Sequence, residues 1–209
     1  MSLRESCFGK EDVEIVEQKP VFEGFFRMLH YRIRHKLFAG GWSQTFSREL
    51  FQRGEAAGAV LYDPVLDRLG LVDQFRIGAI ESEYGPWCLE VVAGSYEDGE
   101  PPDALIRREI EEEAGITELL GLLPITQYYS TPGACSERIH LYCALCDLSS
   151  AGGIHGLDYE HEDIRLDTFC PDEVFAQMYQ SRVNNAATLI ALQWLAMNRE
   201  DLRKKYAGA

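Results

Sequence analysis

Hydrophobic and polar positions alternate along the first fifty residues in the manner of β-strands. Residues 13–18 (VEIVEQ) alternate, and residues 25–38 place Leu29, Tyr31 and Ile33 on one face with basic side chains on the other. Gly40 and Gly41 are typical of a hairpin turn before a further strand at 42–51. The pattern predicts a small antiparallel β domain over residues 1–55.

From residue 56 onward the pattern changes to buried strands separated by helices. Apolar runs predict strands at 56–62, 69–79, 88–94, 125–130 and 138–148, with a turn at Asp63-Pro64 after the first of them. Helices are predicted at 102–114, 171–180 and 184–206, the last with Ile190, Trp194 and Met197 at core spacing. This second domain, residues 56–209, is therefore of the α+β class, with helices packed on a sheet.

The helix predicted at 102–114 carries an unusual concentration of carboxylates. Proline at its entry favours the first turn, and Gly115 stands where a left-handed C-terminal cap belongs. At about 100° per residue, Glu109, Glu112 and Glu113 fall in one stripe, while Glu111 points to the opposite side. One interpretation is an exposed charged helix with surface salt bridges. The other is a site for Mg²⁺, with Mn²⁺ as the alternative ion, because these cations select clustered carboxylate oxygens.

Composition narrows the possible partners and the compartment. The formal net charge of −14 opposes binding to nucleic acid, and no apolar run is long enough to predict a transmembrane helix. The polar start of the chain does not resemble a secretory signal, so we expect a cytoplasmic protein. Cys143 and Cys146 lie three apart on a predicted strand and should face opposite sides of the sheet, which favours buried thiols over a zinc site.

The stretch from residue 94 to residue 116 resembles the Nudix box. The matching residues are Gly94, Glu100, Arg108, Glu109, Ile110, Glu112, Glu113, Gly115 and Ile116. The resemblance implies an α/β/α sandwich that hydrolyses, with Mg²⁺, a nucleoside diphosphate joined to another group. It implies that Glu109, Glu112 and Glu113 bind metal together with the backbone carbonyl of Ala93, and that Glu112 counts among the catalytic residues.

Features outside the box resemble the ADP-ribose pyrophosphatase subgroup of that family. Pro132 lies sixteen residues beyond the box, a position that resembles the subgroup; the alternative is an ordinary turn proline before Gly133. The first domain resembles one that swaps between the subunits of a homodimer. Residues implied to hold substrate are Phe25, Phe26, Arg48, Glu49, Arg53, Arg76, Ser95, Thr131, Pro132, Gly133 and Glu137. The alternatives are core packing for the phenylalanines and surface ion pairs for the arginines.

The segment 153–166 (GIHGLDYEHEDIRL) resembles the mobile acidic loop of the subgroup. The resemblance implies that Glu160 is the base that activates water and that Glu162 is a metal ligand. If the loop is strand-like, both carboxylates share a side and His161 faces solvent. The predicted reaction is hydrolysis of ADP-ribose to AMP and ribose 5-phosphate. The alternatives are another sugar-nucleotide pyrophosphatase, for example one acting on GDP-mannose, and a noncatalytic module that senses ADP-ribose.

Overall fold

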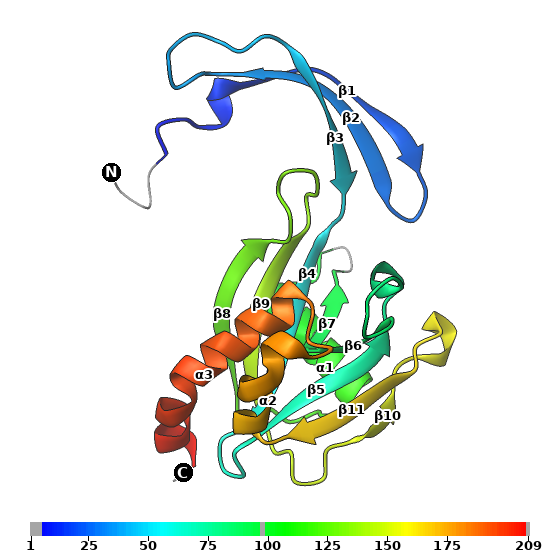
Figure 1. Cartoon of the computed structure of the whole chain (residues 1–209), viewed down its shortest axis with the longest axis vertical. Coiled ribbons are helices and arrows are strands. Elements are labelled where there is room, and N and C mark those ends of the chain that lie inside the picture. The colour runs from blue at the N-terminus through cyan, green and yellow to red at the C-terminus, as the bar shows by residue number, and fades with distance from the viewer. Residues whose placement is uncertain (1–5, 97–98, 208–209) are drawn as a thin grey trace. The chain divides into compact units, whose positions relative to one another are not determined.

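The computed structural model describes residues 6–96 and 99–207, which form two compact units (Figure 1). The first unit runs to Gly54 and includes Tyr129–Glu137; the second comprises Glu55–Tyr128 and the chain from Arg138 onward. The boundary expected from the sequence, between residues 55 and 56, lies one residue from this division. Residues 1–5 and 208–209, which the sequence assigns to the ends of the two domains, lie outside the described residues.

The first unit is built on a three-stranded antiparallel sheet. After a short 3₁₀ turn η1 (Lys10–Asp12), the strands β1 (Val13–Glu23), β2 (Arg27–His35) and β3 (Phe46–Gln52) pair in the order β1-β2-β3. Residues 129–137 join β3 through backbone hydrogen bonds from Phe51 to Ala134 and from Ser136 to Phe51. Leu29 is the one side chain of these three strands that is buried, so the sheet has almost no core of its own.

The second unit is built on an eight-stranded mixed sheet. Its strands are β4 (Glu55–Asp63), β5 (Arg68–Phe75), β6 (Trp87–Glu90), β7 (Val92–Ser95), β8 (Gly121–Tyr129), β9 (Arg138–Leu145), β10 (Gly153–His155) and β11 (Ile164–Phe169). The order is β10-β11-β5-β4-β9-β8, with β6 on β5 and β7 on β4. The central pair β4–β9 is parallel, whereas β4–β5, β5–β11, β5–β6 and β4–β7 are antiparallel.

Helices cover both faces of this sheet. Figure 1 shows α2 (Pro171–Gln177) and α3 (Ala186–Tyr206) in front of the sheet and α1 (Pro102–Ala114) behind it. Alternation along β4 supplies both cores: Val60 and Tyr62 pack with α3, while Ala59 and Leu61 pack with α1. The predicted α/β/α sandwich is confirmed.

The same alternation separates the cysteine pair. Cys143 packs in the core under α3 and Cys146 in the core under α1, as their spacing predicted. All six cysteines are free thiols in the described structure. No helix within the ranges 6–96 and 99–207 is long and apolar enough to cross a membrane.

The buried face of α3 matches the sequence prediction in part: Ile190 and Trp194 pack half-buried against the core as predicted, whereas Met197 does not. Ala191, Leu192 and Leu195 are buried, Trp194 is half-buried on the flank, and Met197 is 77% exposed. The prediction for Met197 was wrong because a long helix with apolar residues on several sides offers more than one stripe at helical spacing. The sheet surface decides which stripe is buried.

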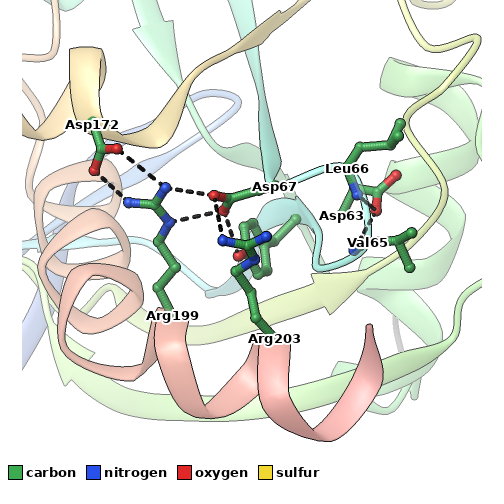
Figure 2. A network of polar contacts seen from close by, with 8 residues as sticks. Asp63, Val65, Leu66, Asp67, Asp172, Arg199 and Arg203 are labelled. Atoms are coloured by element: carbon green, nitrogen blue, oxygen red, sulfur yellow. Dashed lines mark hydrogen bonds and ion pairs between the residues drawn. The ribbon is translucent and has the colours of Figure 1, made fainter. Parts of the chain in front are cut away.

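Polar contacts fix α3 to the turn between β4 and β5 (Figure 2). Asp67, in this turn, binds Arg199 of α3 at 2.5 Å and Arg203 at 3.1 Å, and it accepts a hydrogen bond from the Tyr62 hydroxyl at 2.8 Å. Arg199 also binds Asp172 at the start of α2. The network therefore connects the sheet with both helices on that face.

Candidate active site

The carboxylates at issue lie on α1, whose ends are set by local signals. Pro101 is the N-cap in extended conformation and Pro102 is the first helical residue. Gly115 ends the helix in the left-handed conformation (φ 66°), and its N–H binds the carbonyl of Glu111. The helix runs from Pro102 to Ala114, so the predicted bounds 102–114 are confirmed.

The burial of the glutamates follows their positions around the helix. Glu113 is 2% exposed and Glu109 is 9% exposed, whereas Glu112 is half-buried and Glu111 faces solvent. Three carboxylates therefore turn inward and the fourth turns away, as the spacing predicted. A purely solvated charged face is excluded by this burial.

The backbone of β7 lies directly over two of these carboxylates. The Ala93 N–H donates to Glu113 Oε2 at 3.1 Å. A Cβ placed on Gly94 would lie 1.9 Å from Glu109 Oε1, so no other residue fits there without displacing that carboxylate. Gly94 is thus required for close approach of the strand to α1.

Arg108 is the cation within this acidic group. Its guanidinium contacts Glu112 at 2.8 Å, Glu109 at 2.9 Å and Glu100 at 3.3 Å. Hydrogen bonding to Glu100 and the neighbouring carboxylates raises the pKa of Arg108 above its usual range. The expected pairing of Arg108 with Glu112 is present, and Glu100 adds a second carboxylate to it.

Burial also changes the acidity of the glutamates. It raises the pKa of Glu113 to about 8, against the effect of the Ala93 N–H, and the pKa of Glu109 to about 7, against the effect of Arg108. Repulsion from neighbouring carboxylates, including Glu162 in both cases, adds to the rise. In the absence of a cation, this site therefore holds protons near neutral pH.

The donor set fits a hard divalent cation. Within the described residues, no three His, Cys, Asp or Glu side chains are already arranged around one point as a metal site. The carboxylates are instead held by Arg108 and by the Ala93 N–H. Nevertheless, two buried glutamates, a third beside them and a glycine cradle supply oxygen ligands whose mutual repulsion a divalent cation would offset.

The acidic loop has a different conformation from the one expected. Asp158–Glu160 is a 3₁₀ turn (η3), and His161 follows in the left-handed conformation (φ 59°). The strand-like alternation was therefore wrong, because the turn places Glu160 and Glu162 in different settings, although His161 is exposed as expected. Glu162 accepts a hydrogen bond from the Leu157 N–H at 3.2 Å and interacts with Glu109 and Glu113, whereas Glu160 is exposed.

Arg76 faces this carboxylate group from the end of β5. Its Nε lies 2.6 Å from Oε2 of Glu90, which is 8% exposed. Burial of the guanidinium lowers the pKa of Arg76, but attraction to Glu90 and to Glu113 outweighs this effect and raises the pKa above its usual value. Sequence reasoning missed Glu90. The available signal was a single carboxylate in the otherwise apolar strand WCLEVVAG.

The first unit brings together four of the other predicted residues. The rings of Phe25 and Phe26 meet edge to face at 4.7 Å, and Phe25 is 95% exposed, which excludes core packing for it. Arg53 lies over the Phe26 ring at 4.9 Å and binds Glu137 at 3.0 Å. The result is an exposed aromatic ring next to a fixed guanidinium.

The remaining predicted substrate residues lie on exposed surface. Arg48 stacks on Phe46 at 4.5 Å. The exposed residues are Arg48, Glu49, Thr131, Pro132 and Gly133 in the first unit and Ser95, at the end of β7, in the second. Their roles stay predictions.

Comparison with known proteins shows the family to which the chain belongs. The family model described as NUDIX domain matches residues 52–192, and the chain belongs to this family. It is 40% identical over 200 residues to a protein named ADP-ribose pyrophosphatase from Escherichia coli strain K12, covering 96% of this chain and 95% of that protein.

Two further similarities agree with this family and with its fold. A protein of the same name from Haemophilus influenzae is 40% identical over 202 residues, covering 95% of this chain and 93% of that protein. The solved crystal structure of an ADP compounds hydrolase matches with a TM-score of 0.67 at 17% identity, covering 94% of this chain and 97% of that one. This last likeness shows the fold.

Proposed function

We propose that the protein hydrolyses the diphosphate of ADP-ribose, with water, to AMP and ribose 5-phosphate. The observation that carries the proposal is the burial of Glu109 and Glu113 beneath the backbone of Ala93 and Gly94. Such a carboxylate group suits a cation-dependent reaction of a diphosphate. The name of the relatives that cover nearly the whole chain supports ADP-ribose as the substrate.

Glu109, Glu112, Glu113, Glu162 and the carbonyl of Ala93 would hold the divalent cation. When bound, Mg²⁺ or Mn²⁺ would supply electrostatic stabilisation of the charge that develops on the phosphate oxygens. Glu113 and Glu109 would bind the cation as deprotonated carboxylates, whose negative charge the cation would offset in the buried site where burial now raises their pKa values. Arg108 orients Glu112 through the contact at 2.8 Å, and we assign Glu112 to the catalytic residues.

We assign to Glu160 the removal of a proton from the attacking water. Its exposed position on η3 leaves the carboxylate free of the hydrogen bond that restrains Glu162. The water oxygen then forms a bond to phosphorus, the bridging P–O bond breaks, and the leaving phosphate oxygen takes the negative charge. Glu160 therefore acts as a general base.

Arginines and aromatic rings would bind the rest of the substrate. Arg76 lies beside Glu113, where a guanidinium neutralises diphosphate charge and overcomes the net charge of −14 locally. Phe25 offers an exposed ring for stacking on the adenine, and Arg53, fixed by Glu137, offers a second cation.

We also propose that the protein is a homodimer in which the first unit is swapped between subunits. The strand β1 presents Ile15, Val21 and Phe22 at exposures of 57%, 54% and 63%. Exposed apolar side chains on a strand at a free sheet edge form a surface that proteins normally cover. A second copy of the chain would cover it, and would give this sheet, in which only Leu29 is buried, a further surface to pack against.

We place the reaction in the cytoplasm. The supporting observation is that six cysteines are present as free thiols, which is the ordinary state in a reducing compartment.

A substrate panel tests the proposed function. Initial rates are measured with ADP-ribose, GDP-mannose, NADH and diadenosine polyphosphates in the presence of Mg²⁺, and products are separated by chromatography. We expect ADP-ribose to give the highest kcat/KM, with AMP and ribose 5-phosphate in equal amounts. Preference for GDP-mannose would support the alternative pyrophosphatase. Saturable binding of ADP-ribose without turnover would support the sensing module instead.

A further inference from the structure

Glu90 and Arg76 form a close ion pair at the edge of the proposed site. The distance from Arg76 Nε to Glu90 Oε2 is 2.6 Å, and the Glu90 side chain is 11% exposed while that of Arg76 is 42% exposed. The pair uses the Nε donor of the guanidinium and leaves its two terminal nitrogens for other partners. The carboxylate is therefore the buried, fixed member, and the arginine is the member that faces outward.

Space next to the pair gives Arg76 room to move. A pocket of about 500 Å³ borders both side chains, and its wall also includes Glu81, Ser82, Cys88 and Asn184. An arginine side chain has several rotamers of similar energy, so an open pocket allows it to leave the carboxylate group of α1. The ion pair with Glu90 selects one of those positions.

Glu90 is also well placed to hold Arg76 at a constant position relative to the proposed metal ligands. Glu90 ends β6, which pairs with β5 through Val72 opposite Glu90. Three residues further along the chain, Ala93 in β7 binds Glu113 of α1. One continuous stretch of backbone therefore connects the partner of Arg76 with the backbone that contacts Glu113.

We infer that Glu90 is a positioning residue, which orients Arg76 toward the substrate diphosphate without touching the substrate itself. This inference rests on the proposed function. Without Glu90, the guanidinium occupies the pocket for part of the time, and only the remaining fraction of molecules is ready to bind a diphosphate. Such a defect weakens binding of ground state and transition state alike, so it raises KM more than it lowers kcat.

The first test compares three variants with the wild type. For Glu90→Gln we expect KM for ADP-ribose to rise about 10-fold, a typical effect of losing an orienting partner, with kcat nearly unchanged. Glu90→Asp keeps the charge and should recover most of the loss. Glu81→Gln removes a charge from the same pocket wall and serves as the matched control, with KM expected to stay at the wild-type value. An equal rise in KM for the Glu81 variant would overturn the inference, because it would indicate a general charge effect.

A double-mutant cycle separates positioning from a merely structural role. If Glu90 acts only through Arg76, Glu90→Gln should change KM no further in an Arg76→Ala background. Because that background leaves the Glu90 charge unpaired, Arg76→Lys provides a second background that keeps a cation. A full 10-fold effect of Glu90→Gln in both backgrounds would refute the inference. Absence of ADP-ribose hydrolysis by the wild type would refute the proposed function instead, so the two failures are distinguishable.

Discussion

The replacement Gly94→Ala tests whether Glu109 is a metal ligand, because it moves the carboxylate without altering its chemistry. The new Cβ would lie 1.9 Å from Glu109 Oε1 and 2.0 Å from its carboxyl carbon, where ordinary contact begins at 3.4 Å. The oxygen must therefore withdraw by about 1.5 Å. Metal–ligand distances tolerate only about 0.2 Å, and a misplacement of about 1 Å in an active site costs about 100-fold in rate.

The same replacement should have little effect on folding. Gly94 is not in the left-handed backbone region, so alanine is compatible with its conformation. Moving the Glu109 carboxylate off its rotamer destabilises the folded protein by about 0.5–1.5 kcal/mol. Alanine also lowers the conformational entropy of the unfolded chain, which stabilises the folded protein by about 0.4–1 kcal/mol. The net change in the free energy of unfolding is therefore within about 1 kcal/mol, or about 4 °C in Tm.

The assay measures initial rates of ADP-ribose hydrolysis over a range of Mg²⁺ concentrations, with thermal unfolding in parallel. We expect turnover or apparent Mg²⁺ affinity to fall about 100-fold, which corresponds to about 2.7 kcal/mol. Gly58→Ala is the control, because its Cβ would meet Val92, Ala93 and Leu141 at ordinary distances of 3.4–3.5 Å. Wild-type Mg²⁺ dependence in the Gly94 variant would show that Glu109 does not bind the ion.

Four further expected outcomes rest on burial, charge and surface exposure. Glu113→Gln should lower turnover at least 100-fold, as expected for loss of a metal ligand. Because burial raises the pKa of Glu113 from 4.5 to about 8, the metal-free folded protein holds a proton that the unfolded chain releases, so its Tm should fall from pH 5 to pH 8 and recover with Mg²⁺. A Tm that does not change between pH 5 and pH 8 would contradict the raised pKa of buried Glu113. Asp67→Asn should cost about 1–3 kcal/mol in denaturant unfolding, because Asp67 binds two arginines and the Tyr62 hydroxyl, whereas Lys204→Ala, at an exposed ion pair, should cost less than about 0.5 kcal/mol. Ile15→Glu should convert a dimer into monomers in light scattering, whereas Met197→Glu, at an exposed position on α3, should not; an unchanged mass for Ile15→Glu would exclude β1 as the interface.

Local signals determined the parts of the fold that the sequence predicted well. The bounds of α1 follow from Pro102 and Gly115, which act within one turn of the chain. The placement of Glu109 and Glu113 on one face of α1, with Glu111 on the opposite side, follows from helical periodicity alone. The separation of Cys143 from Cys146 follows in the same way from the alternation of a strand.

Contacts between distant segments decided the rest. The segment that leads into the 3₁₀ turn at Asp158–Glu160 is tied to α1 by a hydrogen bond from the Gly156 N–H to the Glu112 carbonyl at 3.1 Å, a contact that alternation along the chain could not indicate. The pairing of Arg76 with Glu90 depends on the register of β5 with β6, and the buried face of α3 depends on the sheet beneath it.

The sequence by itself thus determined which residues are available for chemistry and which face of its own element each one occupies. Only the tertiary structure decided which of them are desolvated together, as for Glu109 and Glu113 beneath Gly94, and which arginine is held by which carboxylate. The physical reason is the separation along the chain over which each interaction acts. Periodicity and capping act over a few residues, whereas desolvation and ion pairing depend on packing between segments that are far apart in the chain.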